Sequence, residues 1–162
     1  MEILSIKPIG IVKKENGQFI LEIADQFSAG LKNLQGFSHL FVLWWAHLNK
    51  TFQKEQHLSV KKLFRKGPEK MGVFSTRHPQ RPNPIMISTI KVLSIEKELG
   101  IISTPFIDAE PGSPILDLKP YYPMDRVQTC KTPDWCRHWP QWQEETISFN
   151  WKNEIIFDQS VN

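Results

Sequence analysis

The feature that most constrains the fold is a run of residues, 37–48, that is almost entirely apolar. This run, "FSHLFVLWWAHL", is rich in aromatic and β-branched side chains. A continuous apolar run of this kind is typical of a strand that is buried on both faces. We therefore expect a central strand here, with neighbouring strands on both sides.

Shorter runs with a strand pattern recur about every ten residues along the chain. Asn16-Gly17 is a strong two-residue turn signal between two of them and predicts a β-hairpin. Residues 25–36 predict a short helix. The remaining strands are expected at 58–64, 71–76, 85–96 with a bend, 101–108 and 113–120. The pattern predicts a mainly β fold, a single β-barrel domain with short helices over residues 1–126. Residues 127–162 would form a Trp-rich C-terminal extension packed on the barrel or on a dimer partner.

A proline-rich segment, "STRHPQRPNPI" at 75–85, interrupts the strands. Its prolines fix φ and bias the preceding residues toward extended geometry, so the segment predicts a stiff loop. Such a loop would hold Arg77 at a set angle, and a guanidinium group suits a carboxylate. The alternative is that Arg77 and Arg81 pair with Asp108, Asp117 or a neighbouring carbonyl and serve only the structure.

The composition of the chain excludes few classes of function. The formal charge of +3 permits a phosphate-bearing partner, and the basic run at 61–70, "KKLFRKGPEK", is either a solvated loop or a nucleic-acid contact. The beginning of the chain lacks a signal-peptide pattern and no apolar run is long enough to cross a membrane, so we expect a cytoplasmic protein. The spacing of Cys130 and Cys136 does not match that of zinc ligands. We therefore expect reduced cysteines and no metal.

No standard catalytic or nucleotide-binding motif is present. Four stretches match a known family instead, namely "KPIGIV", "GFSHLFVLWWAHL", "MGVFSTRHPQRPNPI" and "FIDAEPGSPILDLKPYYP". On these stretches, over about residues 3–126, the chain resembles the TsaA/TrmO family of S-adenosylmethionine-dependent methyltransferases. The resemblance implies a single-sheeted β-barrel and a homodimer with the cofactor near the subunit interface. It also implies N6-methylation of threonylcarbamoyladenosine at position 37 of tRNA.

The same resemblance implies a set of site residues. The implied cofactor contacts are His47, Leu48, Arg77, Ile87, Pro105, Phe106, Ile107 and Asp108. The motif also contains Arg81, Asn83, Asp117 and Lys119, which would serve either the substrate or the structure. The residue chemistry fits, because Arg77 can bind a carboxylate and Asp108 can accept from ribose hydroxyls or pair with the ammonium group. Phe106, Ile87 and Leu48 could enclose an adenine ring. His47, His78 and Asp117 are candidates for a general base, and none of them is assigned.

The chain departs from the family pattern at three places. The insertion that relatives carry between the first two strands is replaced by the turn at Asn16-Gly17. The family's "DGTP" reads "PGSP" at 111–114, and Met86 replaces a glycine, which narrows a pocket. The tryptophans after residue 126 would cap the barrel or the dimer, or form a stacking surface for a base or a small aromatic acceptor.

Three functional hypotheses remain open on the sequence. The first is a methyltransferase acting on tRNA. The second keeps the cofactor and takes a small metabolite as the acceptor, which the missing loop and the modest basicity favour somewhat. The third is a non-catalytic module that binds S-adenosylmethionine or RNA.

Overall fold

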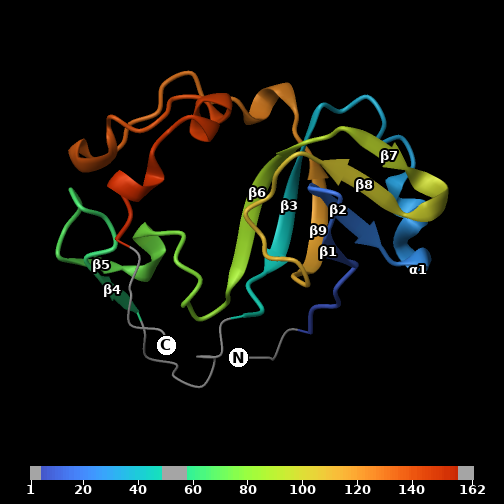
Figure 1. Cartoon of the computed structure of the whole chain (residues 1–162), viewed down its shortest axis with the longest axis horizontal. Coiled ribbons are helices and arrows are strands. Elements are labelled where there is room, and N and C mark those ends of the chain that lie inside the picture. Colours follow the sequence, from blue (N-terminus) through green and yellow to red (C-terminus); the bar gives the residue numbers. More distant parts are fainter. Residues whose placement is uncertain (1–4, 49–57, 157–162) are drawn as a thin grey trace. The chain divides into compact units, whose positions relative to one another are not determined.

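The computed structural model describes residues 5–48 and 58–156, which form two compact units (Figure 1). Unit 1 contains the described residues 5–48 and 83–126. Unit 2 contains the described residues 58–82 and 127–156. The proline-rich loop thus begins in unit 2 and ends in unit 1.

Unit 1 is built around one antiparallel sheet in the order β6-β3-β9-β1-β2-β8-β7. Its strands are β1 (Gly10–Glu15), β2 (Gln18–Ile23), β3 (His39–Trp45), β6 (Ile85–Lys91), β7 (Ser94–Glu96), β8 (Ile101–Thr104) and β9 (Pro114–Pro120). A short helix α1 (Asp25–Ser28), continued by a 3-10 turn at Ala29–Leu31, follows β2. The predicted mainly β fold is confirmed.

The predicted hairpin forms between β1 and β2. Asn16 and Gly17 both have positive φ, 48° and 82°, as a two-residue turn that matches strand twist requires. The register then pairs Glu15 with Gln18 and Gly10 with Ile23. The turn chemistry therefore sets which side chains of β2 face the core.

β3 occupies the central position predicted for it, between β6 and β9. Leu40, Val42 and Trp44 on one face are buried, whereas the alternate residues on the other face are only half-buried. The expectation of burial on both faces was therefore correct for one face and partial for the other. The apolar character of both faces still distinguishes this strand from the half-polar strands around it.

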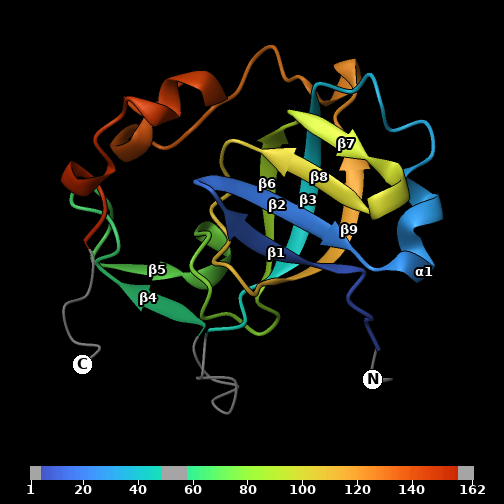
Figure 2. The same cartoon turned by 45° about the vertical axis from the view of Figure 1, so that its right-hand side comes forward.

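The sheet curls so that its two halves face one another. Figure 2 shows β1, β2, β8 and β7 crossing over β6, β3 and β9. The core lies between these halves and includes Val12, Leu21, Ile23, Leu40, Val42, Ile90, Ile102 and Ile115. Closure of the sheet into a complete barrel stays a prediction.

The segment 85–96, expected as one bent strand, forms two strands. The amide of Val92 donates to Ser38 O at 2.8 Å, and the amide of Leu93 donates to Ser103 O at 2.9 Å. The chain therefore leaves the neighbourhood of β3 and joins β8 within two residues. Gly100, with φ of 67°, then turns the chain from β7 into β8.

Unit 2 combines a two-stranded hairpin with a series of short 3-10 turns. The hairpin pairs β4 (Ser59–Lys61) with β5 (Lys70–Gly72). The 3-10 segments are Val73–Ser75, Asp134–Cys136, Gln143–Ile147 and Trp151–Asn153, and Pro123–Asp125 lies in unit 1. Phe64 stacks on Trp135 with ring centroids 5.0 Å apart and forms a β-bridge with Ile155.

The Trp-rich segment therefore packs against residues 58–82. Its expected packing on the barrel or on a dimer partner stays a prediction, as does the division at residue 126. Among the described residues, the helices are too short to cross a membrane.

Candidate functional site

The loop between β8 and β9 presents its side chains alternately to the core and to the outside. Thr104 is fully buried, and its hydroxyl donates to the carbonyl of Phe106 at 3.1 Å. Ile107 and Ala109 are each only 2% exposed and anchor the loop in the core. Phe106 and Asp108 are consequently directed outward on a firmly held backbone.

Asp108 is the end of a chain of hydrogen bonds that starts in the core. The indole Nε1–H of Trp44 donates to Ser88 Oγ at 2.8 Å. The Ser88 hydroxyl in turn donates to Oδ1 of Asp108. Trp44 and Ser88 are both buried, so the two bonds fix the orientation of the carboxylate. Among the described residues Oδ2 has no hydrogen-bond donor, so it can accept a hydrogen bond from a ligand.

His47 follows β3 and is oriented by the other end of the same loop. Its Nδ1 lies 3.2 Å from the hydroxyl of Ser113, a residue that is 1% exposed. Gly112 has φ of 92°, and a Cβ at that position would lie 3.3 Å from His47 Nε2. A glycine therefore both allows this turn and leaves room for the imidazole ring.

Three hydrophobic side chains among the predicted cofactor contacts of unit 1 reach solvent. Leu48 is 65% exposed, Phe106 is 61% exposed and Ile87 is 45% exposed. Phe106 packs edge-on against Phe19 with the ring centroids 6.1 Å apart, which leaves a ring face open. Pro105 is also exposed, whereas the Ile107 side chain is buried, so only the backbone of Ile107 can meet a ligand.

The proline-rich loop is stiffened by hydrogen bonds as well as by prolines. The buried Thr76 hydroxyl donates to Val73 O at 2.8 Å and accepts from the amide of His78 at 3.1 Å. Arg81 donates to Thr76 O at 3.3 Å and lies over the ring of Phe74. Arg81 thus braces the loop, which favours the structural alternative for this residue.

Arg77 differs from Arg81. Its side chain is exposed, and it forms no hydrogen bond or ion pair with the other described residues. The loop therefore presents a guanidinium group on a firm support, as the sequence suggested. Arg77 lies in unit 2, whereas His47 and Asp108 lie in unit 1, so the grouping of the three side chains stays a prediction.

His78 is held in its neutral form. Burial and the positive charge of Arg81 lower the pKa of its imidazole below the usual value. The amide of Gln80 donates to Nδ1 at 3.2 Å, so the proton of the neutral ring resides on Nε2. The outer nitrogen is therefore a hydrogen-bond donor, which argues against His78 as a general base.

The remaining motif residues have structural partners. Asp117 and Lys119 form an ion pair of 2.8 Å on β9, and the amide of Leu118 donates to Asp117 at 2.9 Å. The hydrogen bond and charge of Asp117 raise the pKa of Lys119. The carbonyl of Asn83 accepts from the amide of Ile85 at 2.7 Å and so starts β6. A role for these residues in substrate binding stays a prediction.

Sequence reasoning missed the residues that orient the predicted ones. Trp44, Ser88 and Ser113 are far in sequence from the side chains they hold, and no local motif links them. Among the described residues, no group of three His, Cys, Asp or Glu side chains could hold a metal. Cys136 is buried and donates to Pro133 O, while Cys130 is exposed.

The chain is similar to known proteins over most of its length. Residues 7–125 match the family described as the tRNA-methyltransferase O N-terminal domain. The S-adenosyl-L-methionine-binding protein of Archaeoglobus fulgidus is 32% identical over 132 residues, which cover 73% of this chain and 89% of that protein. The tRNA (adenine(37)-N6)-methyltransferase of Escherichia coli is 33% identical over 116 residues, which cover 70% of this chain.

A solved structure of a family member has a similar fold. The crystal structure of TrmO from Pseudomonas aeruginosa matches with a TM-score of 0.60 and 26% identity over 80% of this chain. The chain spans 62% of that protein and 48% of the Escherichia coli methyltransferase. The match to the Archaeoglobus protein, by contrast, extends over most of its length.

Proposed function

Because the chain belongs to the family of tRNA-methyltransferase O N-terminal domains, we propose that it is an S-adenosylmethionine-dependent methyltransferase acting on tRNA. The acceptor would be N6 of an adenosine of the threonylcarbamoyl type. The name of the Escherichia coli relative supports the tRNA acceptor, and that of the Archaeoglobus relative supports the cofactor. The observation that carries the proposal in this chain is the buried Trp44–Ser88–Asp108 chain, which directs a fixed carboxylate outward.

The side chains present suit the cofactor. Asp108 keeps one oxygen for a ribose hydroxyl or an ammonium group, because Ser88 occupies the other. Phe106 and Leu48 offer exposed apolar surface for an adenine ring, and Arg77 offers a guanidinium for a carboxylate. When bound, S-adenosylmethionine supplies a methyl group on a sulfonium, which is transferred without covalent help from the protein.

The protein's contribution is then mainly orientation. Two firmly held reactants, with reacting atoms about 3–3.5 Å apart, avoid much of the entropic cost of reaction. Asp108 and His47 would provide this alignment, because each is held by a hydrogen bond to a buried serine, Ser88 or Ser113.

We further propose that the protein is a cytoplasmic homodimer. The half-buried outer face of β3 and the exposed Ile87 on β6 provide apolar surface that a second copy could cover. Size-exclusion chromatography with light scattering tests the dimer. A monomer at micromolar concentration would overturn it.

A small-molecule acceptor is the second candidate. It is favoured by the tight turn at Asn16-Gly17, which stands where the family resemblance implies an insertion in members that act on tRNA. In this case the cofactor site would be unchanged and only the acceptor would differ.

Nucleoside mass spectrometry of tRNA decides between the two. Purified protein is incubated with S-adenosylmethionine carrying a labelled methyl group, together with tRNA that contains threonylcarbamoyladenosine without the methyl group. Label in that nucleoside supports the proposal, and Asp108→Asn should reduce it. Label found only in a small-molecule extract supports the second candidate, and cofactor binding without any transfer refutes both.

A further inference from the structure

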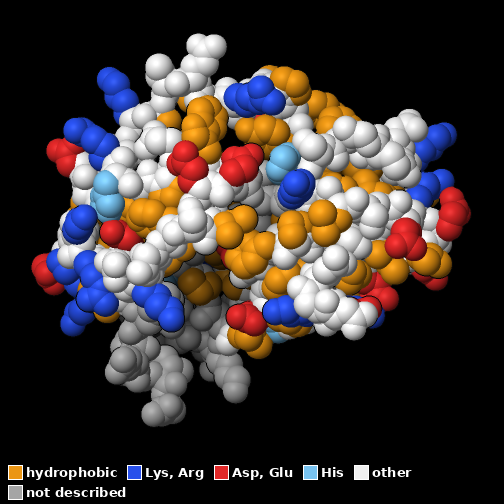
Figure 3. All heavy atoms as spheres, turned by 45° about the horizontal axis from the view of Figure 1, so that its top comes forward, with side chains coloured by type: hydrophobic (Ala, Val, Ile, Leu, Met, Phe, Trp, Pro, Cys, Tyr) orange, Lys and Arg blue, Asp and Glu red, His pale blue; other side chains and the backbone are white. Residues whose placement is uncertain are grey.

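The positive charge of the chain is concentrated in unit 2. Among the described residues, unit 2 has ten Lys and Arg against five Asp and Glu, whereas unit 1 has eight against nine. Figure 3 shows basic side chains gathered at the left of the view, where Figure 1 draws β4, β5 and the C-terminal segment.

The lysines of the hairpin β4–β5 differ in their partners. Just beyond β4, Lys62 is neutralised by Glu69 at 2.8 Å and also donates to Gly67 O. At the end of the strand pair, Lys61 lies directly opposite Lys70, so both point to the same face of the hairpin, and both are exposed. Within the described part of the chain, neither lysine forms an ion pair. Like charges directly opposite across a strand pair are destabilising, so this face would gain stability from a polyanion.

The C-terminal segment holds residues 64–66, which follow β4 in the loop of the hairpin. Phe64 stacks on Trp135, and the amide of Arg65 donates to Glu154 O at 2.9 Å. Lys66 Nζ lies 3.4 Å from the imidazole of His138, which in turn binds the Glu154 carboxylate at 2.8 Å. A basic loop held in this way loses little conformational freedom when it binds.

We propose that the hairpin β4–β5 and its connecting loop form the surface that binds the phosphodiester backbone of the RNA substrate. In this proposal, which rests on the proposed function, the Trp-rich segment is the support that positions the basic loop. An RNA occupant is favoured over other polyanions because unit 2 also exposes aromatic surface. Trp142 is 67% exposed, and such rings stack on unpaired bases.

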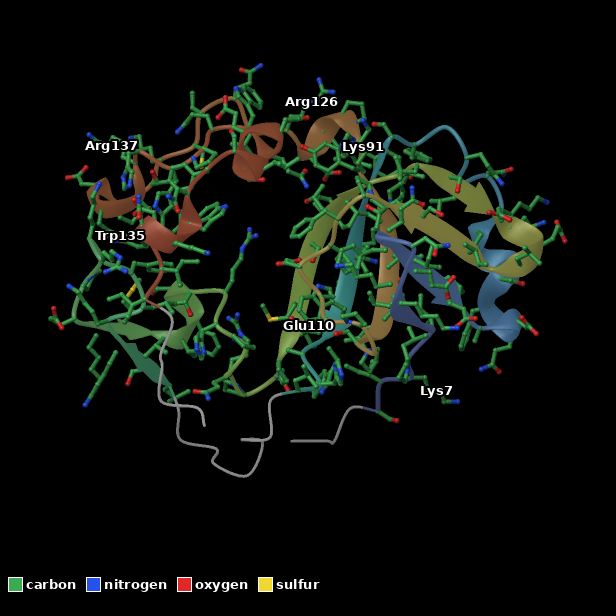
Figure 4. The ribbon with its side chains drawn as sticks, viewed as in Figure 1. Lys7, Lys91, Glu110, Arg126, Trp135 and Arg137 are labelled. Carbon is green, nitrogen blue, oxygen red and sulfur yellow. The ribbon has the colours of Figure 1, made fainter. Side chains whose placement is uncertain are left out.

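The experiment measures the affinity of the full-length protein for an unmodified tRNA transcript between 50 and 200 mM salt. The test variant is Lys61→Gln with Lys70→Gln. The matched control is Lys7→Gln with Lys91→Gln, which removes the same charge from unit 1 (Figure 4). Removing two phosphate contacts should make the negative slope of log affinity against log salt shallower by about two. The affinity at 100 mM salt should fall about tenfold. The control should change the affinity less than about twofold.

A second variant tests the support. Trp135→Leu should weaken tRNA binding while leaving S-adenosylmethionine binding unchanged, because the aromatic cluster of Phe64, Trp135 and Trp139 contains none of the candidate cofactor residues. Circular dichroism confirms that each variant remains folded. Lys62→Gln, which removes a lysine already neutralised, should reduce the salt slope less than Lys61→Gln does.

Two results would overturn the inference. One is equal tRNA affinity and salt slope for the Lys61/Lys70 variant and the control. The other is that polyglutamate or phosphatidylserine vesicles bind as tightly as tRNA and with the same dependence on these lysines, which would indicate a different class of partner. Binding is measured without S-adenosylmethionine, so failure of methyl transfer with intact, lysine-dependent tRNA binding would refute only the proposed function.

Discussion

Replacement of Ser88 by alanine tests whether the Trp44–Ser88–Asp108 chain of hydrogen bonds holds the site. The change removes the acceptor of a buried indole N–H and the donor to a carboxylate. An unsatisfied buried donor costs about 1–3 kcal/mol. The bond to the exposed Asp108 adds less, so we expect unit 1 to lose about 2 kcal/mol of unfolding free energy.

The Trp44→Phe variant separates these effects. In that background no indole N–H is left without an acceptor, so Ser88→Ala should cost about 1–2 kcal/mol less than it does in the wild type. Hydrogen exchange of the β3 and β6 amides during urea titration measures the unfolding free energy of unit 1 separately from that of unit 2. Costs that add to within about 0.5 kcal/mol would show that the two side chains are not coupled and would refute the reasoning.

The cofactor provides a second measurement on the same variants. Ser88→Ala should weaken S-adenosylmethionine binding because Asp108 is no longer oriented, and Ser88→Thr, which keeps the hydroxyl, should restore part of the affinity. Trp44→Phe leaves the bond between Ser88 and Asp108 in place. It should therefore change the cofactor affinity less than Ser88→Ala does, although both variants lose stability.

Three further predictions concern other parts of the chain. Arg77→Ala should weaken S-adenosylmethionine binding by about 1.5–3 kcal/mol in calorimetry without lowering the melting temperature, and an unchanged Kd would refute the assignment of Arg77. The hydrogen bond from His138 lowers the pKa of Glu154 below its ordinary value of 4.5. The stability that this carboxylate provides is therefore complete above pH 4.5 and lost as the pH falls through the lowered pKa. Tryptophan fluorescence in urea between pH 6 and 3 should show this loss, and Glu154→Gln should flatten the dependence. Gly100→Ala should destabilise unit 1 by more than about 2 kcal/mol in urea titration, because φ is 67° and the new Cβ would meet the carbonyl of Ile23. A smaller loss would mean that the β7–β8 turn can shift.

Local patterns in the sequence predicted most of the sheet. The turn at Asn16-Gly17 needs positive φ at two neighbouring residues, and this requirement can be read directly from the residue types. The position of β3 between two strands followed from its continuous apolar character, which is typical of a strand in the interior of a sheet. A bend within residues 85–96 was expected, but the division into two strands at Val92 was not, because it depends on hydrogen bonds to Ser38 and Ser103 in other parts of the chain.

The same limit applies to the candidate site. The stiff proline loop and the exposed Arg77 could be predicted, because prolines act on their own neighbours. The bond from Ser88 to Asp108 spans 20 residues and that from Trp44 to Ser88 spans 44, so only the folded register brings these groups together. The attachment of the Trp-rich segment to Phe64 is equally non-local.

The stacking of Phe64 on Trp135 limits where the protein can be truncated. The region matched by the family ends at residue 125, which suggests a natural place to shorten the protein. Phe64 lies inside that region, yet its aromatic neighbours Trp135 and Trp139 lie beyond it. A version trimmed at residue 125 would therefore expose the ring of Phe64, and we expect it to aggregate.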